Sequence, residues 1–168
     1  SLGRGDQSFS AFYLAIQGAK QSIDVATYTI EPCQSIPKVL LNALAAKAAA
    51  GVKVRFVIEA WNMKEPAKSA LPAWAAASPN HNFEIRYYGS SSLLEGDRPR
   101  SHIKAFIVDA KASASQIVGG RNWTDEYFGI NDKLNFVDHD LLVSGDSAKN
   151  ADKFFDALWA ASSAVTPQ

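Results

Sequence analysis

Apolar and polar residues alternate along this chain at two different spacings, which divide it into predicted strands and helices. A period of two, with β-branched and aromatic residues, predicts strands at residues 22–30, 52–60, 83–88, 101–109, 115–120 and 138–145. A period of three to four predicts helices at residues 9–19, 35–50, 67–77 and 148–161. This order of elements indicates an α/β fold in which a mixed β-sheet is sandwiched between helices. With no repeat or boundary in residues 1–168, a single domain is expected.

Local signals mark the ends of two predicted helices. Ser35 is the expected N-cap of the helix at 35–50, with Pro37 in its first turn and Gly51 just past its end. Pro72 stands where it would interrupt the alanine-rich helix at 67–77. Residues 89–100 carry turn residues without periodicity and are expected to form a polar loop.

Composition limits the classes of partner and compartment. Lys and Arg number 17 and so do Asp and Glu, so net charge gives no general attraction to nucleic acid, which is not favoured as a partner. The one cysteine, Cys33, allows neither an intramolecular disulfide nor a cysteine zinc cluster, and it is expected as a small apolar filler. No apolar run approaches the length of a membrane span. The chain starts at Ser1 without a signal peptide, so its compartment is left open.

The segment SHIKAFIVD, residues 101–109, places two polar side chains at the head of an apolar strand. Because side chains alternate faces with period two along a strand, His102 and Lys104 are expected to point toward one spot. Taken alone, the pair has a simpler interpretation, since the end of a strand is often in contact with water. Other motifs in the chain are needed to favour a functional site.

Those motifs follow at fixed spacings. His102, Lys104 and Asp109 form H-x-K-x4-D, and GGRN follows at 119–122 where the next strand ends. DEYFG at 125–129 and F-x-D-x-D at 136–140 come next. Together they resemble the HKD signature of the phospholipase D superfamily. With SIDVATYTIE, AAAGVKVRFVIEA and FFDALW, the chain is similar to the first half of bacterial cardiolipin synthase-like enzymes.

The resemblance implies a role for each motif residue. His102 would be the nucleophile that forms a phosphohistidine, while Lys104 and the amide of Asn122 would neutralise the phosphate oxygens. Asp138 would accept a hydrogen bond from His102 and fix its tautomer. Asp109 has the opposite parity to His102 and is interpreted as structural, as are Gly119 and Gly120 of the turn. The superfamily works without metal or other cofactor, and none is expected.

The chain also departs from the superfamily pattern and carries further polar residues. Gly120 lacks the hydroxyl that some relatives have at this position. Arg121 is expected either at the rim of the site or as a solvated surface residue. Glu31 and Glu59 could line the same cleft, although strand-end carboxylates in water are the favoured interpretation.

The remaining aromatic and histidine residues are assigned to structural positions. Core packing is favoured over a ligand-binding wall for Trp123, Tyr127 and Phe128. His81 is expected to be exposed, and His139 is expected to face away from Asp138.

The chain carries one HKD motif and so one motif histidine, whereas the superfamily mechanism uses two. Either two copies pair as a homodimer, or the chain is one half of a two-motif enzyme. Both alternatives predict an apolar surface around the motif. The expected function is cleavage or transfer at a phosphodiester, with phospholipid as the preferred substrate and peripheral membrane contact or export of a bacterial protein left open. A single-motif endonuclease and a non-catalytic half-domain are the alternatives.

Overall fold

A single mixed sheet forms the centre of the computed structural model, which describes residues 3–63, 65, 67–77, 80–89 and 100–164. The strands are β1 (Ser22–Thr27), β2 (Lys53–Glu59), β3 (Phe83–Tyr88), β4 (Ala105–Val108), β5 (Ser115–Gly119), β6 (Asp140–Ser144) and β7 (Ser163–Ala164). Their order in the sheet is β6-β5-β4-β1-β2-β3-β7. The strands β1, β2 and β3 are parallel, and the other neighbours are antiparallel.

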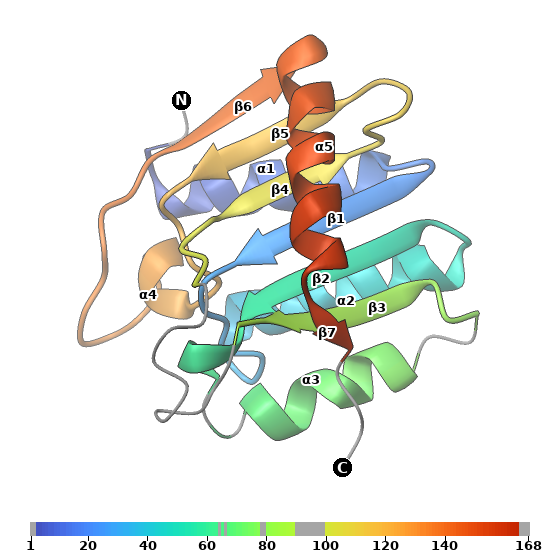
Figure 1. Ribbon diagram of the computed structural model, residues 1–168. Helices are drawn as coiled ribbons and strands as arrows, with labels where there is room; N and C mark the ends of the chain where they lie inside the picture. Colours follow the sequence, from blue (N-terminus) through green and yellow to red (C-terminus); the bar gives the residue numbers. More distant parts are fainter. Residues whose placement is uncertain (1–2, 64, 66, 78–79, 90–99, 165–168) are drawn as a thin grey trace.

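Helices cover both faces of this sheet (Figure 1). They are α1 (Gly5–Gly18), α2 (Ser35–Ala49), α3 (Ala67–Ala76), α4 (Asp125–Phe128) and α5 (Asp146–Ala160), with a 3-10 turn at Ala60–Asn62. Figure 1 shows α1 and α2 behind the sheet and α5 crossing its front. The predicted α/β class, a mixed sheet between helices, is therefore confirmed.

The two faces of the sheet bury apolar side chains to different extents. On the face of α1, α2 and α3, the larger core includes Phe12, Ile23 and Phe106. Under α5, a smaller core joins Ile107 to Phe155. Phe106 and Ile107 are neighbours in β4 that point to opposite faces, as the period of two requires.

Several boundary predictions were wrong. Hydrogen bonds or side-chain packing with other parts of the fold explain each difference. The N-cap of α2 is Gln34, not Ser35. The Asp125 carboxylate of α4 instead accepts hydrogen bonds from the backbone N–H groups of Ser35 (3.0 Å) and Ile36 (2.8 Å), a favourable place for a negative charge. Pro72 lies inside α3 without ending it. Leu71 of that helix is fully buried, and this packing outweighs the lost hydrogen bond.

Other differences concern elements and residues that the pattern did not reveal. The short helix α4 and the two-residue strand β7 were not predicted. The strand predicted at 101–109 begins only at Ala105. Cys33 is exposed and is not an apolar filler, because it lies in the turn just before α2.

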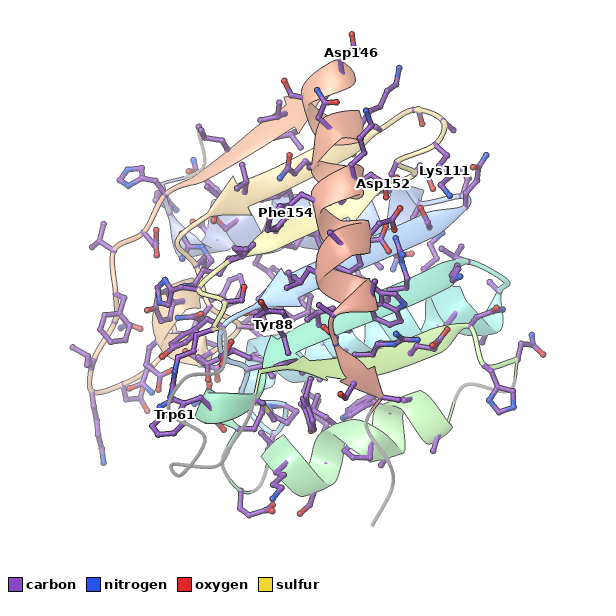
Figure 2. The ribbon with its side chains drawn as sticks, viewed as in Figure 1. Trp61, Tyr88, Lys111, Asp146, Asp152 and Phe154 are labelled. Atoms are coloured by element: carbon purple, nitrogen blue, oxygen red, sulfur yellow. The ribbon has the colours of Figure 1, made fainter. Side chains whose placement is uncertain are left out.

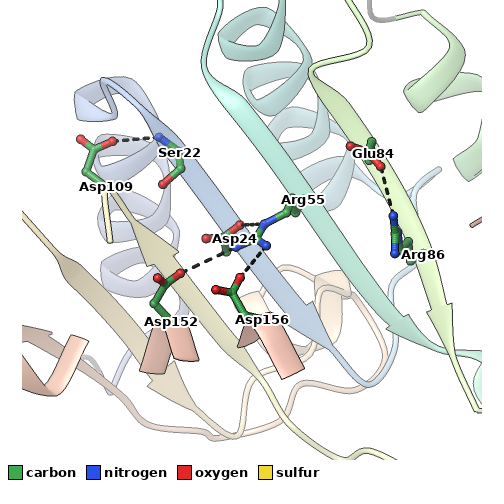
Figure 3. A network of polar contacts seen from close by, with 8 residues as sticks. All are labelled: Ser22, Asp24, Arg55, Glu84, Arg86, Asp109, Asp152 and Asp156. Carbon is green, nitrogen blue, oxygen red and sulfur yellow. Dashed lines mark hydrogen bonds and ion pairs between the residues drawn. The ribbon is translucent and has the colours of Figure 1, made fainter. Parts of the chain in front are cut away.

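An ion cluster that is buried except at Asp156 joins α5 to the sheet (Figure 3). Arg55 of β2 contacts Asp24 of β1 at 2.6 Å, and it reaches Asp156 at 2.6 Å and Asp152 at 3.7 Å on α5. Its guanidinium carbon also lies 4.9 Å from the ring centroid of Phe155. Burial raises the pKa of Asp24, and the hydrogen bond from Arg55 partly offsets that effect. One cation thus compensates three carboxylates.

We expect Arg55→Met to lower the free energy of unfolding by about 3–5 kcal/mol at neutral pH, because it leaves buried carboxylates without a cation. In the variant, the folded-state pKa of Asp24 rises further above its unfolded value. Stability then falls as pH rises between the two values, so the deficit should shrink at acidic pH. Urea unfolding at both pH values measures this. Lys53→Met, at an exposed site in the same strand, is the control, and an equal loss in both variants would contradict a role for the ion cluster.

Candidate active site

The motif residues other than Asp109 meet at one edge of the sheet, where β1 and β2 end (left in Figure 1). Pairing of β1 with β4 aligns Ala26 with Ala105, and pairing of β5 with β6 aligns Gly119 with Asp140. The segment before β4, the GGRN turn after β5 and the residues before β6 therefore lie at the same edge. Open α/β sheets place ligands at the carboxyl ends of their parallel strands, so this edge is the candidate site.

His102 and Lys104 contact each other directly at this edge. The Nζ atom of Lys104 lies 3.1 Å from both Nδ1 and Nε2 of His102, and it donates a hydrogen bond to the His102 carbonyl at 3.1 Å. The side chains do converge, although residues 101–104 precede the strand, so strand alternation is not the cause. The Lys104 side chain folds back toward His102 instead.

Their environments differ in exposure. His102 is exposed, whereas Lys104 is 8% exposed. Burial lowers the pKa of Lys104, and the negative charge of Asp138 acts in the opposite direction. A partly desolvated ammonium group beside an accessible imidazole is suited to an anionic group that approaches from solvent.

Tyr28 is a member of this site that the sequence analysis missed. Its ring centroid lies 4.3 Å from that of His102, and the Nζ atom of Lys104 lies 5.1 Å from the Tyr28 ring. The residue directly follows β1, so its place at the carboxyl end of a parallel strand is the signal that could have found it. Tyr28 limits the positions open to the imidazole.

The two glycines of the GGRN turn make room for acidic side chains. A Cβ atom on Gly120 would lie 2.6 Å from both carboxylate oxygens of Asp138, and one on Gly119 would collide with Asp140. The missing hydroxyl at position 120 thus has a steric cause, because any side chain would displace Asp138.

Asn122, at the end of this turn, is buried with unused hydrogen-bonding capacity. Its Oδ1 atom has no hydrogen-bond partner among the residues that the structure describes. Buried polar atoms are almost always paired, so an exception at a candidate site is informative. The Oδ1 atom is thus an unused acceptor at the end of the turn.

Asp138 lies beside the turn without contacting the histidine. It is half-buried, and its Oδ1 accepts the backbone N–H of His139 at 2.7 Å. Within the described part of the chain, the hydrogen bonds of the His102 ring run to Lys104. A hydrogen bond from His102 to Asp138 stays a prediction.

Asp109 lies at the other end of β4, away from His102. Its carboxylate accepts hydrogen bonds from the backbone N–H groups of Lys20 (2.9 Å), Gln21 (2.6 Å) and Ser22 (3.0 Å), the last drawn in Figure 3. These contacts tie the turn before β1 to the end of β4. The side chain is thus fully engaged with backbone groups, in keeping with a structural role.

Arg121 was expected at the rim or on the surface, and that expectation was wrong. Only 2% of the residue is exposed, and its Nε contacts Asp140 at 2.7 Å. Its Nη2 also donates to the Asp138 carbonyl at 2.9 Å, while Ser8 donates to Asp140 at 2.6 Å. A charge buried this deeply requires such partners, and they fix the segment before β6.

Glu59 was expected to meet water, and this was also wrong. The residue is 1% exposed, and its Oε2 accepts the backbone N–H of Ser101 at 2.7 Å. Its Oε1 has no partner among the described residues. Glu59 therefore holds the segment that carries His102. Glu31, the other carboxylate considered, is half-buried.

The remaining aromatic and histidine residues mostly follow expectation. Trp123 and Phe128 pack in the core against Phe12, while Tyr127 lies 4.8 Å from the ring of Phe136. His81 is exposed, as predicted, and His139 is exposed as well. In the described ranges, no group of His, Cys, Asp or Glu side chains is arranged to hold a metal ion. Over the same ranges, no helix is long and apolar enough to cross a membrane.

Comparison with known proteins identifies the family. The model of the family described as cardiolipin synthase, PLD-like domain, matches residues 13–159. The chain belongs to this phospholipase D-like family. The superfamily resemblance of its motifs is thereby confirmed.

Relatives in sequence are longer than this chain. An uncharacterized protein of Helicobacter pylori (strain ATCC 700392 / 26695) is 31% identical over 160 residues, with 86% of this chain and 30% of the relative covered. Cardiolipin synthase C of Escherichia coli (strain K12) is 29% identical over 172 residues, covering 94% of this chain and 34% of the relative. The chain thus spans about a third of the curated relatives it matches.

Similar solved structures show the same fold. NucT from Helicobacter pylori aligns with a TM-score of 0.73 at 16% identity, covering 95% of this chain and 92% of that one. The phospholipase D family member Nuc from Salmonella typhimurium aligns at 0.61 and 21% identity, covering 92% and 88%. Phosphatidylserine synthase of Haemophilus influenzae Rd KW20 aligns at 0.74 and 14% identity, covering 92% of this chain and 35% of that one.

Proposed function

We propose that this domain cleaves or transfers phosphodiesters through a phosphohistidine at His102, with phospholipids as its substrates. The observation that carries the proposal is the 3.1 Å approach of the Lys104 ammonium to both ring nitrogens of an exposed His102. A phosphodiester bound beside this pair would meet a nucleophile and a positive charge together.

The chemistry proceeds in two steps with atoms and charge balanced. A neutral ring nitrogen of His102 attacks phosphorus, an N–P bond forms, and the P–O bond to the leaving alcohol breaks. A second histidine, protonated at the start, donates its proton to the leaving oxygen. Water or an alcohol then attacks phosphorus and gives its proton to that second histidine, and the N–P bond breaks to release His102.

Lys104 and Asn122 would stabilise the charge that develops on the nonbridging oxygens. Lys104 supplies a full positive charge, and Nδ2 of the Asn122 amide would supply neutral donors. Asp138 would accept a hydrogen bond from His102 and hold the tautomer that attacks. Asp109, Gly119 and Gly120 maintain the backbone around these groups. No step in this scheme calls for a cofactor.

The second histidine is proposed to come from a second HKD unit, either another copy of this chain or another half of a longer protein. Exposed apolar side chains support pairing near the site, in the connection between α4 and β6: Ile130, Leu134, Phe136 and Val137. Monomers rarely expose such a cluster without a partner. Peripheral contact with a membrane is the other use that this connection could have.

A mixing experiment tests the pairing of two copies. If both histidines of a pair are required, His102→Ala chains mixed with wild type should form inactive mixed pairs. Specific activity would then follow the square of the wild-type fraction after subunit exchange. A linear dependence would show that each chain works alone, and a strictly monomeric, inactive chain would favour the non-catalytic half-domain.

Substrate class is tested by incubating the chain with phosphatidylglycerol vesicles and, separately, with plasmid DNA, each with and without a chelator. Balanced charge predicts weak binding to DNA at physiological salt, so lipid turnover is expected to dominate. Turnover should persist with the chelator. DNA cleavage without lipid turnover would favour the endonuclease alternative, for which the similar length of NucT and Nuc is the supporting observation.

A further inference from the structure

An apolar cavity of about 270 Å³ lies between α5 and the front face of the sheet. Nine of its ten lining residues are apolar, and Gln116 is the polar one. Cavities that take whole drug-sized ligands measure about 300–1,000 Å³. This one has the size and chemistry for a segment of hydrocarbon and offers too few polar groups to bind a base or a sugar.

Small side chains create this space. Ala26 of β1 pairs with Ala105 of β4, and both line the floor of the cavity, while Ala151 lines it from α5. Phe154, which is 54% exposed, lies on the flank of α5 over the sheet (Figure 2). A large aromatic ring left half in solvent beside an apolar cavity is well placed to cover a bound chain.

The cavity is continuous with the segment that carries the candidate active site. Ile103, between His102 and Lys104 in sequence, is one of its lining residues. His102 and Lys104 therefore each lie one residue away along the chain from the cavity wall. Ala26 and Ala105 also border the small space that contains Lys104 on the other side of the sheet.

We propose that this cavity binds part of an aliphatic chain of the substrate while the phosphate lies at His102 and Lys104. The inference rests on the proposed function and narrows it, because it requires a phosphodiester with a hydrocarbon arm. The occupant is the acyl chain rather than a side chain of a second copy, since Ile103 of the cavity wall lies between the two residues that would hold the phosphate.

Binding of two soluble probes tests this directly. Dodecyl phosphate, kept below its micelle concentration, and ethyl phosphate share a headgroup and differ in hydrocarbon length. Each buried methylene strengthens binding about fourfold, so burial of a few should make dodecyl phosphate bind more than about tenfold tighter. Isothermal titration calorimetry measures both dissociation constants. Equal affinity for the two probes would overturn the proposal.

Variants of α5 test whether tighter binding of dodecyl phosphate than of ethyl phosphate comes from the cavity. Ala151→Leu fills the space and should remove the preference for dodecyl phosphate while leaving ethyl phosphate unchanged. Ala157→Leu, at an exposed site on the same helix, should keep the preference. Phe154→Asp places a charge at the half-exposed edge and should weaken dodecyl phosphate alone, even if Ala151→Leu folds poorly. Preference kept in both Ala151→Leu and Phe154→Asp would exclude the cavity as its source.

Two further outcomes are informative. The first distinguishes an acyl-chain site from a pairing surface. The second distinguishes failure of the cavity proposal from failure of the proposed function. If Ala151→Leu changes the molecular mass in solution but not the chain preference, the cavity is a pairing surface and the proposal fails. If His102→Ala retains the chain preference while no variant or wild type turns over phospholipid, the cavity stands and the proposed function fails.

Discussion

Replacement of His102 by alanine is expected to abolish turnover with little change in the free energy of unfolding. Loss of a covalent nucleophile removes the reaction path, and losses on the order of 10⁴-fold or more are usual for such residues. His102 is exposed and outside any strand, so its removal leaves no core cavity. Turnover of a phospholipid and urea unfolding of the same preparations measure the two effects.

His139→Ala is the matched control, because His139 is exposed and close to the same edge of the sheet. It should keep activity within a few-fold of the parent. Wild type incubated with labelled lipid and quenched in alkaline denaturant, in which the N–P bond survives, should also carry label on His102. If His102→Ala kept activity within a few-fold of the parent, the nucleophile assignment would be wrong.

The fold was largely predictable from sequence because its strands and helices have clear periods. The predicted strand at 83–88 matches β3, and the helix at 35–50 matches α2 to within one residue. Elements of only about one period, such as the four-residue α4, are too short to show a pattern. The acceptor for the first backbone N–H groups of α2 is the carboxylate of Asp125, about ninety residues away, so the sequence near Ser35 could not reveal it.

Some residues of the candidate site were also predictable from sequence, and others were not. His102, Lys104 and Asn122 were predicted from the resemblance of their motifs to the superfamily signature, and the structure brings His102 and Lys104 into contact. The burial of Arg121 and Glu59 was not found, because it depends on Asp140 and Ser101, which only the fold brings to them. From sequence alone, a charged residue is expected to be exposed to solvent unless a partner for its charge is known. Tyr28 was missed because its contact with His102 crosses between β1 and the segment before β4.

These partners also explain how an exposed imidazole is held in place. Glu59 fixes the backbone at Ser101, Tyr28 packs against the ring, and Lys104 donates to the His102 carbonyl. The segment 101–104 lies outside the strand ladder, so these contacts supply the order that strand pairing gives elsewhere. Preorganisation of this kind is what a nucleophile that attacks phosphorus requires.

Lys104→Ala is expected to lower kcat/KM for a phosphodiester by about 10²–10³-fold, the usual effect of removing one group that stabilises charge in the transition state. Stability should not fall, because a partly desolvated ammonium group is removed along with its charge. Lys153→Ala, at an exposed site on α5, is the control and should retain full activity.

The pH dependence provides an independent measurement of the same residue. Burial lowers the pKa of Lys104 from 10.5, so in the free enzyme its positive charge is lost at a lower pH than that of an exposed lysine. The proposed mechanism also needs a protonated second histidine, so two groups lose a required proton as the pH rises. Lys104 should add a decline of its own below pH 10.5 to the alkaline side of the kcat/KM profile. Lys104→Arg keeps the charge at all these pH values and should remove this added decline while leaving that of the second histidine, although its larger planar group lowers the rate. An unchanged alkaline limb in Lys104→Arg would assign the decline to another group.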